Sequence, residues 1–128
     1  MVYEYTTTVD FPLTKNKNGW YVTKEAVKKM VRYYNTHHND YMFPVVLEKE
    51  ADENNIMVGV LNSSKKLVVT HHDEAKYSIE IPVLLRTDFD PDQFNQAVDL
   101  YDVETNPNNP NELISFRIKN VVAIPKED

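Results

Sequence analysis

The chain has 128 residues, of which 41% are hydrophobic and 27% charged, with a formal net charge of −6 and no cysteine. This composition is typical of a single globular domain, and no apolar run reaches the roughly 18 residues that span a membrane. The lack of cysteine excludes a disulfide framework and cysteine-ligated metals. Since the first residues also lack the pattern of a signal peptide, a cytoplasmic protein is expected.

Negative charge is concentrated between Arg86 and Arg117, where acidic residues occur with no basic residue among them. Such a region repels phosphate groups. The sequence therefore disfavours a nucleic-acid partner.

The first predicted strand covers residues 2–11, where apolar and aromatic residues alternate with more polar ones. Pro12 ends this strand, and an Asn-rich turn that contains Gly19 leads to Trp20. We expect Trp20 to anchor the core beside the following helix. Ligand stacking is the alternative role for this residue.

An amphipathic helix is predicted over residues 23–36. Thr23 is a good N-cap because its hydroxyl can accept a hydrogen bond from a backbone N–H of the first turn, and Val22 and Val27 occupy the positions of a hydrophobic staple. Apolar residues recur at three- and four-residue spacing, and cationic residues fall on the other side. The apolar positions are Val27, Met30, Val31 and Tyr34, and the cationic positions are Lys24, Lys28, Lys29 and Arg32.

Strands are predicted next over residues 43–47, 56–61, 67–70 and 77–85. The second and third of these are joined by the turn LNSSKK and have the pattern of a β-hairpin. Gly59 inside the strand pattern indicates a bulge or a close approach of two backbones. The run 77–85 has the cleanest two-residue period, so we expect it to be the central strand.

A second helix is predicted over residues 91–101, because Asp90 and Pro91 form the start signal of a helix, with Gln93 three residues after the cap. A strand over residues 98–103 competes with this interpretation, since apolar residues also alternate there.

The remaining segments are a loop over residues 105–111 and strands over residues 114–118 and 121–124. The sequence thus predicts an α+β fold in one domain, residues 1–128. We expect six or seven mostly antiparallel strands with the first helix covering one sheet face, and a small barrel is the main variant.

The four histidines form two similar pairs, His37-His38 and His71-His72, each followed by carboxylate or amide residues. Imidazole and carboxylate groups can bind zinc, iron or manganese if the two segments meet. Because the spacing matches no known ligand pattern, we expect residues of a helix end and a turn, and neither a metal nor another cofactor. The alternative is a small metal-dependent or serine hydrolase built on these pairs, for which the chain offers Ser63, Ser64, Ser78 and Ser115.

The segment NKNGWYVTKEAVKKMVRYYN, residues 16–35, resembles the opening of some tailed-phage prohead maturation proteases, and FPVVL, VGVL and SIEI resemble their next strands. Those proteases carry a catalytic His shortly after the first helix and strand, whereas residues 45–50 contain no His. Ser115 is the serine comparable with their nucleophile. The resemblance therefore implies a phage or prophage origin and a related core of sheet and helix, and the protease activity is not carried over.

Aromatic residues are numerous for a core of this size: the chain has 8 Tyr, 5 Phe and 1 Trp. Tyrosine is favoured at interfaces because it buries a large area while keeping a polar tip. The leading interpretation is a non-enzymatic binding or assembly protein that acts through a protein surface. The predicted surface residues are Trp20, Tyr33, Tyr34, Tyr41 and Tyr101.

The predicted partner is another protein or a second copy of the chain. Edge strands at residues 2–9 and around Pro82 favour a homo-oligomer, most simply a two-fold dimer. A small-ligand or nucleotide-binding protein is a further alternative.

Overall fold

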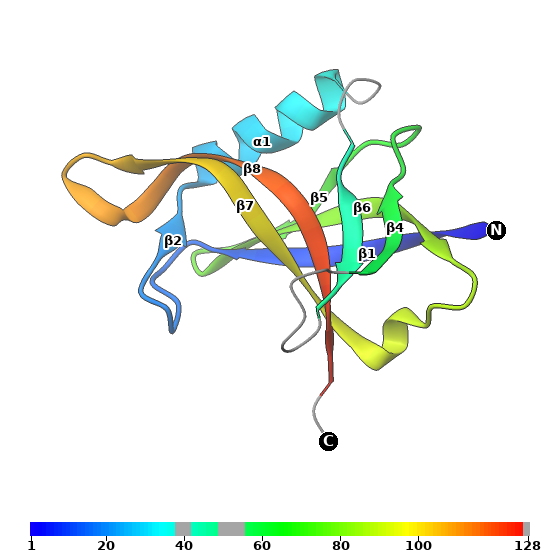
Figure 1. The fold of residues 1–128 in the computed structure, drawn as a ribbon. Helices are drawn as coiled ribbons and strands as arrows, with labels where there is room; N and C mark the ends of the chain where they lie inside the picture. Colours follow the sequence, from blue (N-terminus) through cyan, green and yellow to red (C-terminus); the bar gives the residue numbers. More distant parts are fainter. Residues whose placement is uncertain (38–41, 49–55, 127–128) are drawn as a thin grey trace.

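The computed structural model describes residues 1–37, 42–48 and 56–126. Eight strands form one sheet, which curls into a half-barrel, and one α-helix lies across it beside β8 (Figure 1). In chain order the elements are β1 (Val2–Pro12), β2 (Tyr21–Val22), α1 (Lys24–Thr36), β3 (Pro44–Leu47), β4 (Ile56–Leu61), β5 (Val68–His72), β6 (Lys76–Arg86), the 3₁₀ turn η1 (Pro91–Gln93), β7 (Phe94–Asn106) and β8 (Asn109–Pro125).

Two long antiparallel pairs, β1–β6 and β7–β8, make up most of the sheet. The other edge of β6 pairs with β4 and β5, and the other edge of β8 pairs in parallel with β2 and β3. The antiparallel pair β3–β4 joins the two halves. The sheet is therefore mixed: among the described residues five strand pairs are antiparallel, as expected for most of the sheet, and two are parallel. Parallel pairing arises because α1 carries the chain along β8 from β2 to β3, a helical crossover that a short loop cannot provide.

The predicted helix is confirmed, together with its cap and its two faces. Thr23 Oγ1 accepts a hydrogen bond from the backbone N–H of Ala26 at 3.0 Å. Val22 and Val27 of the predicted staple are both buried, and all four cationic residues of the helix are exposed. The face turned to the core contains Ala26, Val27, Met30, Val31 and Tyr34.

The predicted central strand is also confirmed, since β6 pairs with three other strands. The predicted hairpin between residues 56–61 and 67–70 is wrong: β4 and β5 each pair with a different half of β6. A strand of eleven residues is long enough to hold two short strands end to end along one edge.

Both predictions for Gly59 are confirmed. Val45 pairs with Gly59 and Val46 with Met57, so Val58 is the extra residue of a bulge. A Cβ atom built on Gly59 would collide with the backbone oxygen of Leu84 in β6. Only glycine allows β4 and β6 to lie this close.

The predicted second helix is wrong. Asp90 does act as a cap, since its side chain accepts a hydrogen bond from the backbone N–H of Asp92 at 3.0 Å, but η1 ends at Gln93. From Phe94 the chain continues as β7, which agrees with the competing strand interpretation. The alternating apolar residues of β7 pack against the core, and pairing with β8 outweighs the local helix signal. The expected loop 105–111 narrows to a two-residue turn, and the expected strands 114–118 and 121–124 are parts of one strand, β8.

No helix within the described ranges is long and apolar enough to cross a membrane.

Candidate functional site

The candidate site lies where α1 fills a gap along one edge of β8. On this edge β2 pairs with Glu112 and Leu113, and β3 pairs with residues 121–123. Between these two points no strand of the described residues is paired to the edge, so its backbone groups need other partners. The helix supplies one of these partners.

Tyr34 on α1 bonds to the backbone of β8 in the middle of this gap. Its hydroxyl donates a hydrogen bond to the carbonyl oxygen of Ile118 at 2.8 Å and accepts one from the N–H of Ile118 at 3.2 Å. The side chain is buried, and its ring packs edge-on against Phe43 with centroids 5.5 Å apart. Burial, with a smaller contribution from Tyr101, raises the pKa of Tyr34 well above its usual value. The phenol is therefore neutral and acts as a structural hydrogen-bond bridge.

Two irregularities of the β7–β8 pair flank this bridge. Asp99 pairs with Asn120 and Leu100 with Ile118, which leaves Lys119 as an extra residue in β8. A second shift follows Tyr101, where Asp102 has a positive φ of 53°. Aspartate tolerates this left-handed conformation better than most residues. Bulges redirect neighbouring side chains, and they are frequent beside functional sites.

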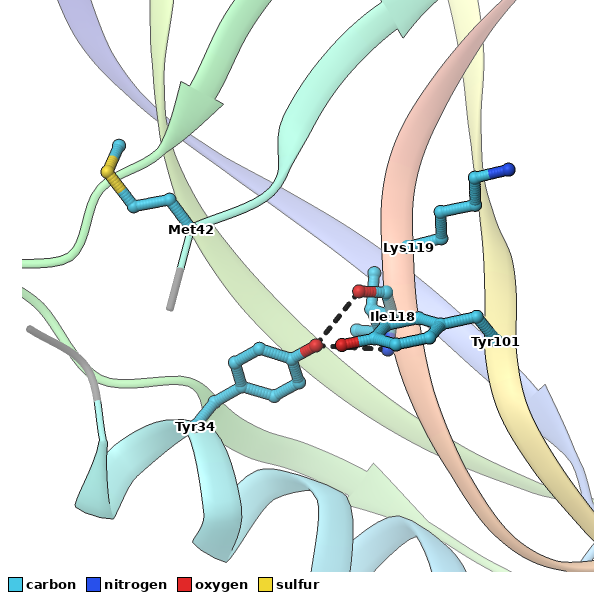
Figure 2. A pocket seen from close by; sticks show the side chains of 5 residues that line it. All are labelled: Tyr34, Met42, Tyr101, Ile118 and Lys119. Carbon is cyan, nitrogen blue, oxygen red and sulfur yellow. Dashed lines mark hydrogen bonds between the residues drawn. The ribbon is translucent and has the colours of Figure 1, made fainter. Parts of the chain in front are cut away.

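The result is a small hollow on the surface, which we call the tyrosine pocket. It has a volume of about 300 Å³ and is lined by Tyr34, Met42, Tyr101, Ile118 and Lys119. Figure 2 shows the ring of Tyr101 reaching from β7 toward the hydroxyl of Tyr34, with Met42 on the opposite side and the ammonium of Lys119 extending away from both rings. Met42 is 61% exposed and Tyr101 41% exposed. Buried Tyr34 and Ile118 form the base of the pocket, and the more exposed residues form its rim.

Cations border the tyrosine pocket on the side of α1. The guanidinium carbon of Arg117 lies 3.8 Å from the centre of the Tyr33 ring, and this ring also packs against His37 with centroids 4.8 Å apart. Desolvation lowers the pKa of Arg117, but Tyr33, Tyr101 and Asp102 raise it by more. Arg117 is therefore a permanent positive charge held between α1 and β7.

The structure brings together three of the five predicted surface residues. Tyr34 and Tyr101 line the pocket, and Tyr33 lies beside it under Arg117. Tyr41 lies outside the described residues. Trp20 is half-buried against the core, as expected for an anchor, and its backbone N–H donates to Asn16 Oδ1 at 3.2 Å.

Trp20 also lines a second hollow, which we call the seam cavity. It has a volume of about 560 Å³ and lies between β1 and β7, the two strands at the margins of the half-barrel. Asp10, Lys76 and Gln96 contribute polar groups to it. The Nε2 atom of Gln96 is buried and has no hydrogen-bond partner within the described part of the chain.

The histidines do not form a metal site among the described residues, where no group of three or more metal-binding side chains occurs. His37 ends α1, and its N–H donates to the carbonyl oxygen of Tyr33. His71 Nε2 lies 3.0 Å from Asp73 Oδ2, and the His72 ring stacks on Tyr77. His38 lies outside the described residues.

The serines offer little to the hydrolase alternative. Ser78 is the cross-strand neighbour of His71, but it is buried and its hydroxyl donates to Asp10 instead. The Ser115 hydroxyl lies 3.5 Å from the ammonium of Lys29. Neither contact joins a serine to a histidine, the general base on which this alternative depends.

Sequence reasoning missed Met42, Arg117 and Lys119. Lys119 and Arg117 read as the polar positions of an ordinary strand, and Met42 as part of the link after the helix. The bulges that place Arg117 and Lys119 depend on the pairing of β7 with β8, and no local residue pattern predicts these bulges. The positive φ at Asp102 has a weak signal, because Asp is enriched in that conformation.

No protein family, curated protein or solved structure matches this chain.

Proposed function

We propose that this protein is a non-enzymatic binding or assembly protein that uses the tyrosine pocket to hold a side chain of another protein molecule. The observation that carries the proposal is the exposure of Met42 and Tyr101 at the rim of a hollow with an apolar base. Residues that carry most of the binding energy at protein interfaces often fill such pockets, and tyrosine and methionine are enriched in protein interfaces. The partner is a different protein or a second copy of the chain.

A rigid base supports this proposal. Tyr34 is fixed at both ends, by the helix behind it and by its two hydrogen bonds to Ile118. A preformed pocket binds with a smaller entropic cost than one that must first be ordered. The side chains around it also agree with a binding role, since none of them forms an acid–base pair suited to catalysis.

Selection from a displayed library of short random peptides tests the proposal. We expect clones that bind the protein but not a Tyr101→Ser variant, whose fold is checked by its thermal melt. Ile114→Ser is the matched control, because Ile114 is a similarly exposed apolar residue of β8 outside the pocket. A selection that yields no clone sensitive to Tyr101→Ser refutes the proposal. Light scattering of the purified protein then distinguishes a second copy from a different partner.

A small-ligand-binding protein is the second candidate, and the seam cavity favours it. Its volume is within the range of ligand pockets, and it combines an indole ring with the unpaired amide of Gln96. Screening small polar aromatic compounds by NMR tests this candidate. A compound that binds in the seam cavity should perturb the NMR signal of the Trp20 indole, and its binding should be lost in the Gln96→Leu variant. Compounds that still bind this variant count against the seam cavity as the site.

A further inference from the structure

The cations beside the tyrosine pocket point to the chemistry of the partner. We define the cationic rim as Lys29, Arg32, Arg117 and Lys119. Lys29 and Arg32 lie on the exposed side of α1, and Arg117 and Lys119 belong to β8. Lys29 reaches β8 at Ser115, two residues before Arg117, and Arg32 lies about one helical turn after Lys29 on the exposed side of α1.

None of these four cations forms an ion pair with a carboxylate in the described part of the chain. The ion pairs that do form involve other cations, such as Lys28 with Glu25 and Arg86 with Asp88. Among the described carboxylates, Asp102 acts on Arg117 through an electrostatic contribution that raises the pKa of Arg117. In a protein with a net charge of −6, a group of unpaired cations around an apolar hollow is a local exception.

We infer that the tyrosine pocket and the cationic rim bind an acidic segment of a partner protein, in which one apolar side chain enters the pocket and flanking carboxylates face the rim. This inference rests on the proposed function, and it adds the chemical class of the partner. Complementary charge around a buried anchor increases the rate of association and excludes partners of the wrong sign.

A single-stranded nucleic acid would carry the same negative charge, but the site suits it less well. Stacking of successive bases needs several open aromatic faces. Here the Tyr34 ring is buried and Arg117 covers the Tyr33 ring, so that among the described tyrosines of the site only Tyr101 is exposed.

Three synthetic peptides test the inference, each with one phenylalanine flanked on both sides by glutamates, by glutamines or by lysines. We expect the glutamate peptide to bind about tenfold more tightly than the glutamine peptide at low ionic strength, and salt to reduce this difference. Lys119→Glu and Arg32→Glu should each weaken binding of the glutamate peptide more than binding of the glutamine peptide. Lys24→Glu, at the start of α1 and outside the rim, is the control and should change neither.

Equal binding of the glutamate and glutamine peptides, tighter binding of the lysine peptide, or no binding of any peptide would overturn the inference. So would tighter binding of a single-stranded oligothymidylate than of the glutamate peptide. The peptide selection keeps the two proposals apart: clones that depend on Tyr101 but lack acidic residues leave the proposed function standing and refute the acidic partner.

Discussion

Replacing Tyr34 by Phe removes one oxygen atom that serves two backbone groups of β8. The N–H and the carbonyl of Ile118 both bond to this hydroxyl, and Ile118 is 1% exposed, so both groups lose a buried partner. Leaving a buried donor or acceptor unsatisfied costs about 1–3 kcal/mol per group. With two groups affected, we expect Tyr34→Phe to lower the free energy of unfolding by about 2–6 kcal/mol, a large part of the roughly 5–15 kcal/mol of a typical domain.

Urea unfolding followed by Trp20 fluorescence measures this loss. Tyr77→Phe is the matched control, because Tyr77 is also a buried tyrosine but its hydroxyl makes no hydrogen bond within the described residues. We expect the control to change the free energy of unfolding by less than about 0.5 kcal/mol. If Tyr34→Phe is as mild as the control, the gap in the β8 edge is satisfied in some other way and the bridge is not structural.

Three further changes test the fold. Val31→Asp places an unpaired charge among buried side chains and should lower the free energy of unfolding by several kcal/mol. The exposed Lys28→Glu should lower it by no more than about 0.5 kcal/mol in the same urea melts. Similar losses for the two variants would mean that the two faces of α1 are wrongly assigned. Gly59→Ala should lower the free energy of unfolding by about 1–3 kcal/mol, because its methyl group meets the backbone of β6, and an unchanged midpoint would contradict this close approach. The pKa of Asp73 is lowered from 3.8 to about 2, mainly by its hydrogen bond with His71, so the carboxylate contributes stability that is present above pH 3.8 and lost as the pH falls toward 2. In thermal melts at decreasing pH, Asp73→Asn should lack this loss of stability. Parallel curves of melting temperature against pH for the two proteins would refute this contribution of Asp73.

The elements that sequence reasoning predicted well are those with local signals. The helix combines a cap at Thr23 with a regular apolar stripe, and β6 has an uninterrupted two-residue period. The second helix was wrongly predicted after Asp90 because its signals are local and the structure of this segment is not. A cap and a proline are local signals, but the conformation of residues 94–106 is decided by pairing with β8, which lies later in the chain.

The candidate site was predictable only in part, for the same reason. A surplus of tyrosines pointed to Tyr33, Tyr34 and Tyr101, but composition alone could not show that Tyr34 is a buried bridge and that Tyr101 is open to solvent. The position of Lys119 depends on a one-residue shift between two strands. Such a shift is a property of the pair, and neither strand carries it alone.

The position of β8 in the sheet has a consequence for how the chain folds during synthesis. This strand comes after all of its partners in the chain, which are β2, β3, β7 and α1. The apolar face of α1 therefore has no complete packing surface until β8 leaves the ribosome. We expect nascent chains that end before β8 to stay protease-sensitive, and the fold to form late and in one step. Its speed is then limited by closure of the long loops between the early strands and β8.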